Sequence, residues 1–329
     1  MMEIIAAGLM VTLTIIITAS RGHGKDTSIL WASVLISVSM VLNINPVYLF
    51  ADGWVGGRNH ADLGANLLLL TGVYFLARAI HRAAQPSSHG TKSSYEVWAK
   101  AGLMGAAILA TIMFILIDAP VTSTAFMRDY GGQWAAGLYS AGQYLYIGGV
   151  MAAAGWTCVR FRKAWTTGIY TAAFALVGLG CLSAVLFVVD VLALDALHVL
   201  GLVEAFPALS ALYTVLNSAT FLFLCTGMAL PPATRKVAAV YETARTNSVL
   251  ADLEPVWGQA VAGNTGLTLD LGVVPKRPDR RRSELHRMIV EIQDALARNP
   301  EARDKIGDEG LGKLASASDH LERLSWRPR

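Results

Sequence analysis

Two asparagines and a proline interrupt one of the apolar stretches of this chain and could carry chemistry inside a membrane. The stretch contains the sequence Asn43-Ile44-Asn45-Pro46. Proline removes a helix hydrogen bond and leaves a carbonyl oxygen unpaired one turn earlier. The two amides can either satisfy that opening or line a polar cavity next to it. The pattern therefore predicts a kinked helix, and it leaves open whether the amides only brace the kink or bind a ligand, an ion or a transported solute.

Acidic side chains and histidines form a second candidate group, close to the ends of other apolar stretches. Its members are Asp52, His60, Asp62, Asp190, Asp195, His198 and Glu204. Carboxylates beside histidines could bind a cation or a basic ligand, and the alternative is a polar rim in contact with water. The sequence has no HxxxH or HxxE pair on one helix face. We therefore predict no metal, no cofactor and no catalytic residue.

Charged residues are scarce in most of the chain and common near its end. The 329 residues are 54% hydrophobic and 16% charged, with a mean hydropathy of +0.46, whereas soluble domains carry about 25% charged residues. The last 93 residues hold 14 of the 27 Lys and Arg and 14 of the 24 Asp and Glu. This composition excludes a secreted disulfide scaffold, a disordered regulator and an ordinary soluble enzyme. The three cysteines lie in apolar runs and are expected to be buried.

Seven apolar stretches are long enough to cross the hydrocarbon core of a bilayer, which is about 30 Å thick. They cover residues 4–19, 28–50, 63–80, 97–117, 134–158, 165–189 and 208–230. The sequence therefore predicts an all-α integral membrane protein with seven transmembrane helices in residues 1–232. A small, mainly helical cytoplasmic domain follows in residues 233–329. The seven helices could form a single bundle or a parallel 3+1+3 duplication.

Basic residues are distributed unequally between the predicted loops. Eleven lie on the side of the first, third and fifth loops and the end of the last helix, against Arg58 and Arg128 on the other side. The positive-inside rule then predicts an outside N-terminus, a cytoplasmic C-terminus and a multi-pass protein of the inner (plasma) membrane. No Asp, Glu, Lys or Arg falls near the middle of a span. This argues against a pump with a buried carboxylate relay and excludes a voltage sensor.

The predicted cytoplasmic domain contains an amphipathic helix at about 283–298, preceded by a basic run. The run ends in Arg280, Arg281 and Arg282, and we expect it to contact anionic lipid. A solvated face or an intramolecular contact is the alternative. Binding to nucleic acid is not expected, because the domain has no net charge and no recognition motif. Glu291 and Asp294 are expected on the exposed side of the helix, available to a cytoplasmic protein partner. Residues 267–274 read as a strand or an extended loop.

Two elements of this domain resemble a family of uncharacterised actinobacterial membrane proteins. Leu253-Glu254-Pro255-Val256-Trp257 is similar to the family's Leu-x-Pro-Leu-Trp element, and residues 287–296 are similar to its Arg-x-Val-x-Glu-Ile-Arg-Asp-x-Leu helix. Gln293 stands where the family has arginine, and residues 57–66 are loosely similar to its second outer loop. The resemblance implies seven helices and a C-terminal domain of unknown function. It also brings a transporter label that rests on helix count.

Two functions from different classes fit these observations. The first is a non-enzymatic membrane receptor or signal-relay protein that passes a membrane or extracellular signal to the cytoplasmic domain. The alternative is a transporter of a small neutral solute that uses the Asn43, Asn45 and Pro46 kink. A membrane-embedded enzyme is least favoured, because no carboxylate or histidine pair lies at catalytic depth. The expected partners are the lipid bilayer, a small ligand and a cytoplasmic protein, and the oligomeric state is left open.

Overall fold

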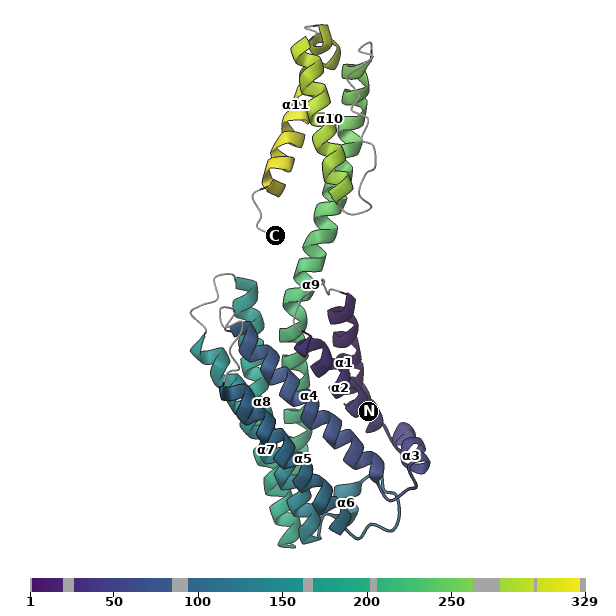
Figure 1. Ribbon diagram of the computed structural model, residues 1–329, viewed down its shortest axis with the longest axis vertical. Helices are drawn as coiled ribbons and strands as arrows, with labels where there is room; N and C mark the ends of the chain where they lie inside the picture. The colour runs from purple at the N-terminus through teal and green to yellow at the C-terminus, as the bar shows by residue number, and fades with distance from the viewer. Residues whose placement is uncertain are drawn as a thin grey trace. The chain divides into compact units, whose positions relative to one another are not determined.

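All regular elements in the described part of the chain are helices, which confirms the all-α prediction (Figure 1). The computed structural model describes residues 2–19, 27–84, 94–161, 168–201, 206–262, 279–298 and 301–325. The helices are α1 (Met2–Ala19), α2 (Ser28–Leu42), α3 (Asn45–Trp54), α4 (His60–Ala84), α5 (Ser94–Leu116), α6 (Phe126–Tyr130), α7 (Trp134–Arg160), α8 (Gly168–Val199), α9 (Phe206–Val261), α10 (Asp279–Arg298) and α11 (Glu301–Ser325). The predicted strand or loop at 267–274 lies outside the described residues.

The chain divides into two compact units, Met1–Thr234 and Arg235–Arg329. Four helices of the described residues are long and apolar enough to cross a membrane: α4, α5, α8 and α9. The pair α2 and α3 passes the same test only when taken together, and the apolar part of α1 is shorter. Several apolar helices of this length are typical of a multi-pass membrane protein.

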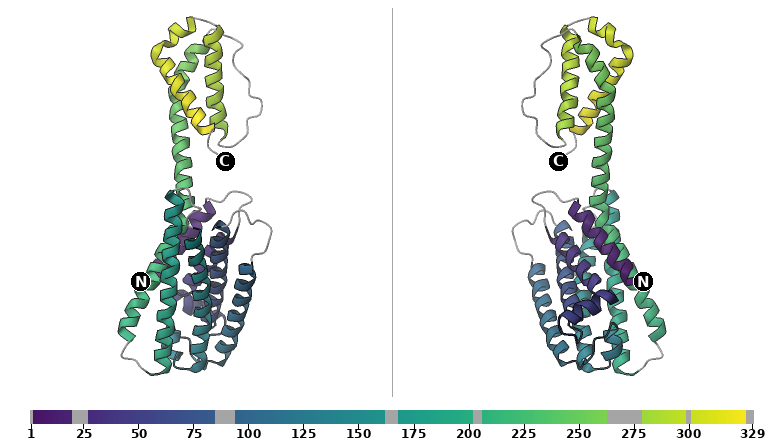
Figure 2. Two further views of the ribbon diagram at one scale, coloured as in Figure 1. Left: turned by 90° about the vertical axis from the view of Figure 1, so that its left-hand side faces the viewer. Right: turned by 90° about the vertical axis from the view of Figure 1, so that its right-hand side faces the viewer.

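Helix α7 is the central helix of the first unit, although it is not among the apolar candidates for a span. It packs against α4, α5 and α8, while α2 packs against α4 and α1 (Figures 1 and 2). A helix surrounded by other helices does not need a lipid-compatible surface on every side. Its central position therefore explains how α7 can carry glycines, tyrosines and a glutamine where its neighbours carry leucine and valine.

The second predicted span is broken rather than gently kinked. Helix α2 ends at Leu42 and α3 begins at Asn45, with an angle of 90° between them. Ile44 has an extended backbone, and Pro46 lies in the first turn of α3, where its missing N–H is not needed. The predicted disruption at Pro46 is therefore present, and it begins three residues before the proline.

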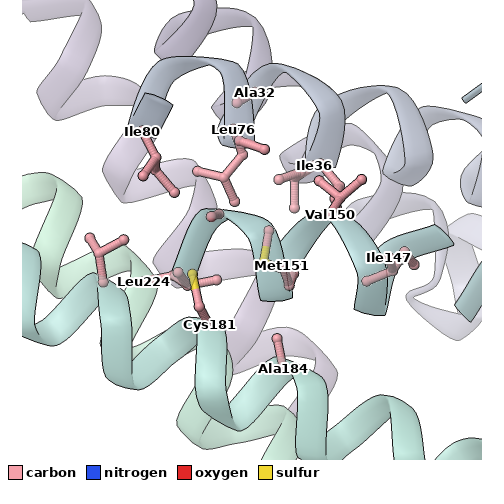
Figure 3. Close-up of a cluster of buried hydrophobic side chains, with 14 of the residues drawn as sticks. Ala32, Ile36, Leu76, Ile80, Ile147, Val150, Met151, Cys181, Ala184 and Leu224 are labelled. Atoms are coloured by element: carbon pink, nitrogen blue, oxygen red, sulfur yellow. The ribbon is translucent and has the colours of Figure 1, made fainter. Parts of the chain in front are cut away.

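The core of the first unit joins seven helices, α1, α2, α4, α5, α7, α8 and α9, through close packing. Figure 3 shows Ile36 of α2, Leu76 of α4, Met151 of α7, Cys181 of α8 and Leu224 of α9 in one cluster of buried side chains. All three cysteines of the chain are buried. Small residues at the interfaces of membrane helices let the backbones approach closely, and the resulting van der Waals contacts hold the helices together.

Glycines mark the closest contacts of this core. A Cβ added at Gly155 of α7 would lie 3.1 Å from Cys181 Cβ on α8, and one at Gly180 of α8 would lie 2.7 Å from Leu224 on α9. A Cβ at Gly227 would lie 2.8 Å from the carbonyl oxygen of Ala173. Backbone lies directly against backbone at Gly227, so the α8–α9 contact has no room for a side chain there.

The second unit is a small helical domain made of the last part of α9 together with α10 and α11. Leu253 of α9, Leu285 and Ile292 of α10 and Ala317 of α11 are completely buried in its core. Helix α11 contains a break at Gly307, whose φ of 65° and ψ of 177° suit glycine alone. Helix α9 itself continues through Pro231 and Pro232, where the apolar sequence ends.

Substitution of Gly227 tests the α8–α9 contact. We expect Gly227→Ala to destabilise the first unit by about 1–3 kcal/mol, because the new methyl group must displace backbone. Gly149→Ala on α7 is the matched control, since a Cβ there meets nothing within 4 Å. The measurement is reversible unfolding of the purified protein in mixed micelles. Equal stability of the two variants would contradict the packing described for Gly227.

Candidate functional site

A hydrogen-bonded triad of polar side chains joins α4 to α7. The Tyr139 hydroxyl donates to Asp62 Oδ2 at 2.6 Å, and the amide nitrogen of Asn66 donates to the same oxygen at 3.0 Å. This nitrogen also lies 2.9 Å from the Tyr139 oxygen. Both neighbours donate to Asp62, which is the arrangement that suits an ionised carboxylate. The hydrogen bonds of the triad therefore fit an ionised Asp62 at the start of α4.

Helix α8 brings a second carboxylate to the other side of α7. Ser140 of α7 and His198 of α8 both lie near Asp195. Tyr144 of α7 lies near both Asp195 and Asp62. The sequence-predicted residues Asp62, Asp195 and His198 are therefore gathered around one helix, and we call them, with Tyr139, Ser140 and Tyr144, the α7 cluster.

Three side chains near this region have buried polar atoms without a hydrogen-bond partner among the described residues. They are Gln143 of α7, through its amide nitrogen, and Asp190 and Asp195 of α8, through carboxylate oxygens. Asp190 is almost completely buried, at 3% exposure. It precedes Asp195 by five residues, which is about 140° around a helix, so it does not share the face that Asp195 presents to α7. The predicted acidic rim is thus divided between two faces of α8.

A buried polar network fixes the turn that precedes Asp62. Asp52 accepts the backbone N–H groups of Asn59 at 3.0 Å and Ala61 at 2.9 Å, and it accepts the Thr122 hydroxyl at 2.6 Å. The Asn59 side chain accepts the Tyr48 hydroxyl at 3.0 Å. The carboxylate therefore satisfies N–H groups at the start of α4, as a helix cap does. It also ties the loop after α5 to that start.

An aromatic cluster covers the Tyr139 side of the triad. Phe114, Phe126 and Tyr139 lie with ring centroids 5.8–6.0 Å apart. His60 is exposed and its ring lies 5.6 Å from that of Phe114. Apolar contact on one face and a carboxylate on the hydroxyl together hold Tyr139 in one orientation. His60 is therefore at the edge of this group, outside the hydrogen-bonded triad.

The asparagine–proline motif is separate from the α7 cluster. The Asn43 amide donates to the carbonyl oxygen of Ser39 at 2.9 Å, which satisfies a carbonyl at the end of α2. Asn45 and Pro46 are exposed on the first turn of α3. Asn43 thus does what the bracing alternative predicts, and the structure does not bring the three residues together with the acidic group. Glu204 lies outside the described residues.

The second unit corrects one expectation about the cytoplasmic domain. Glu291 was expected on the exposed side of its helix, but it is 1% exposed. It accepts the indole N–H of Trp257 at 2.6 Å, and Arg287 lies over the Trp257 ring at 5.9 Å. Trp257 of α9 buries the carboxylate because its indole supplies the missing donor. Asp294 is exposed, as expected.

The basic run begins α10. Arg280, Arg281 and Arg282 fall in its first turn, where Arg281 is exposed and Arg282 is half-buried. Positive charges at a helix N-terminus oppose the helix dipole. The three arginines therefore do not stabilise α10 electrostatically.

Sequence reasoning missed Tyr139, Gln143, Asn66 and the cap formed by Asp52 and Asn59. The spacing of the residues could have indicated three of them. Asn66 is four residues after Asp62, and Gln143 is four residues after Tyr139, so each of these two pairs lies on one face of a helix. No three His, Cys, Asp or Glu side chains of the residues described are grouped so that they could hold a metal ion. The arrangement suits recognition of a polar ligand or a change of helix packing.

No protein-family model matches this chain, and no curated protein and no solved structure is similar to it.

A double-mutant cycle tests the triad. Tyr139→Phe removes the donor of this hydrogen bond, and Asp62→Asn removes the charge of its acceptor; a hydrogen bond to a charged group contributes about 1.5–3 kcal/mol. We expect the double variant to lose clearly less stability than the sum of the single variants, measured by unfolding in mixed micelles. Tyr241→Phe, at an exposed tyrosine of α9, is the control and should combine additively with Asp62→Asn. Additivity for Tyr139→Phe as well would refute the contact.

Proposed function

We propose that this protein is a non-enzymatic membrane receptor or signal-relay protein in which the helical bundle reports to the C-terminal domain. One observation carries the proposal. Helix α9 supplies Leu224, Cys225 and Met228 to the core of the first unit, and Leu250, Leu253 and Val256 to the core of the second. A change in the packing of α9 within the bundle is therefore carried into a domain that is built on the same helix.

The α7 cluster is the site at which we propose that the signal enters. It contains the Asp62–Tyr139 hydrogen bond that joins α4 to α7, and α7 packs against α8 through Gly155 and Cys181. Helix α8 in turn contacts α9 through Gly180 and Leu224. A ligand that alters the Asp62–Tyr139 contact would shift α7, and close packing leaves α8 and α9 little freedom to absorb the shift.

The seven-span topology and its orientation belong to the same proposal. We propose that the N-terminus is outside, that the C-terminal domain is cytoplasmic and that the bundle lies in the inner (plasma) membrane, because eleven basic residues stand on one side of the predicted spans against two on the other. The α7 cluster would then be on the outer side. The arginines at the start of α10 would face anionic lipid, whose negative charge offsets their unfavourable position on the helix dipole. Fluorescence of a green fluorescent protein fused after Arg329 checks the cytoplasmic end.

The relay is tested by perturbing the α7 cluster and measuring the C-terminal domain. We expect Asp62→Asn, in full-length protein in lipid nanodiscs, to change hydrogen exchange of amides in α10 and α11 by threefold or more. The matched control is Asp118→Asn, which makes the same chemical change at an exposed aspartate. Tyr139→Phe should have the same direction of effect as Asp62→Asn, since the first breaks the Tyr139–Asp62 contact and the second weakens it by removing the charge.

A break in α9 provides the second arm of this experiment. Insertion of a Gly-Ser-Gly-Ser segment after Ala239, among exposed residues of α9, should abolish the effect of Asp62→Asn on α10 and α11 while leaving the stability of both units unchanged. Deletion of residues 237–329 should leave the bundle folded and remove the output. Identical exchange in Asp62→Asn, Tyr139→Phe and wild type would refute the relay.

Transport of a small neutral solute is the second candidate, and the 90° break between α2 and α3 favours it. Discontinuous membrane helices often form solute sites in transporters. If the chain transports, vesicles that contain it should take up glycerol, urea or glucose faster than empty vesicles in an osmotic swelling assay. Asn43→Ala and Asn45→Ala should slow this uptake several-fold, and deletion of residues 237–329 should not. Uptake equal to that of empty vesicles for all three solutes would contradict this candidate.

A further inference from the structure

A buried histidine connects the last helix of the second unit to its first. His320 of α11 is 4% exposed, and its Nε2 atom lies 3.0 Å from the hydroxyl oxygen of Thr246 on α9. Thr246 is also the first buried residue of α9 in this unit, because residues 235–245 are exposed or half-buried. The contact therefore closes the end of the core at which α9 enters the second unit.

The hydrogen bonds of Thr246 determine the protonation state that fits this contact. Its hydroxyl donates to the carbonyl oxygen of Glu242 at 2.8 Å. The single hydroxyl proton is thereby used, so the oxygen can only accept from His320. Nε2 must then carry a proton, and in the neutral imidazole Nδ1 carries the lone pair. The neutral ring satisfies the site fully, and a second proton would add a charge at Nδ1.

The surroundings of His320 oppose that second proton. Burial of the ring, and then the positive charges of Arg245 on α9 and Arg323 on α11, lower the pKa of His320 below its ordinary value of 6.5. Both of these charges have the same sign as the imidazolium. The folded second unit therefore binds this proton less well than an opened one does.

We infer that the His320–Thr246 contact is a pH-sensitive latch, which holds the end of α11 against α9 at neutral pH and releases it when the imidazole takes a proton from water. The direction follows from linkage. The pKa of His320 is lower in the folded state than in the open state, so its contribution to the stability of the folded state is fully present above pH 6.5. That contribution is lost as the pH falls from 6.5 through the pKa of the folded state. The open state then takes up one proton, so its population rises by up to about tenfold for each pH unit in that window.

The latch does not rest on the proposed function, because it concerns the second unit alone and would operate beneath a receptor or a transporter. Mild acidification of the compartment that contains the domain would loosen α11 without unfolding the bundle. Loosening exposes core residues of the domain such as Leu314 and Ala317. The domain would therefore change its binding surface in response to pH.

The test is hydrogen exchange of α11 amides in the full-length protein in nanodiscs, measured from pH 7.5 to pH 5.0 and corrected for the intrinsic pH dependence of exchange. In the wild type we expect the opening of residues 314–325 to increase several-fold to tenfold per pH unit below 6.5. His320→Gln keeps a donor for Thr246 and cannot titrate, so its opening should not depend on pH. His286→Gln removes an exposed histidine of α10 and should behave like the wild type.

A second variant keeps the test decisive if His320→Gln does not fold. Arg245→Gln removes, at an exposed position of α9, one of the positive charges that oppose the imidazolium, and it retains both residues of the latch. It should reduce the pH dependence, because the folded state then opposes the second proton less strongly. The inference is overturned if the wild type shows no pH dependence, or if His320→Gln retains the slope of the wild type. Loss of the pH dependence in His286→Gln, with the pH dependence retained in His320→Gln, would also overturn the inference, because it would assign the pH response to the surface of α10.

Discussion

The packing of α7 against α4, α5 and α8 is the contact on which the rest of the first unit depends. A helix in that position meets other helices on most of its surface, so its side chains are selected by its neighbours rather than by lipid. Glycines at the α8 side let the backbones approach, and tyrosines at the α4 side find hydrogen-bond partners there. The same burial therefore produces both the close packing and the concentration of polar groups, because a buried hydroxyl or carboxylate must be paired within the protein.

Much of this architecture could be predicted from sequence because it follows from runs of apolar residues. Helices α4, α5 and α8 each contain an apolar stretch that the sequence predicts as a span, and the disruption at Pro46 follows from the chemistry of proline. The size of that disruption could not be predicted. A missing N–H allows any bend from a slight kink to a complete break, and the turn of the chain at Ile44 depends on how α3 and α4 pack.

The surroundings of acidic residues could be predicted less well than the apolar helices, and Asp62 and Glu291 show the reason. Both Asp62 and Glu291 stand among charged or polar positions that a helix pattern assigns to water. Asp62 is held instead by Tyr139, which lies 77 residues away, and Glu291 is buried by Trp257, which lies 34 residues away. The donor that satisfies the carboxylate comes from another helix in each case, so no local pattern contains it.

The relay that we propose requires a contact whose loss changes the free energy of helix packing appreciably, and these long-range hydrogen bonds have that magnitude. A hydrogen bond to a charged group contributes about 1.5–3 kcal/mol, and coupling between distant sites in proteins is typically about 1–3 kcal/mol. In the relay that we propose, loss of the single Tyr139–Asp62 contact would therefore be large enough to favour a different packing of α7. When a helix shifts slightly, the energy of each apolar contact along α8 and α9 changes by less than the energy of this hydrogen bond. The apolar contacts are continuous, however, from Gly155 to Leu224. In the relay that we propose, a discrete polar contact would set the state and a continuous apolar contact would transmit it. Helix α9 would connect them to the second unit, because its residues form part of both cores.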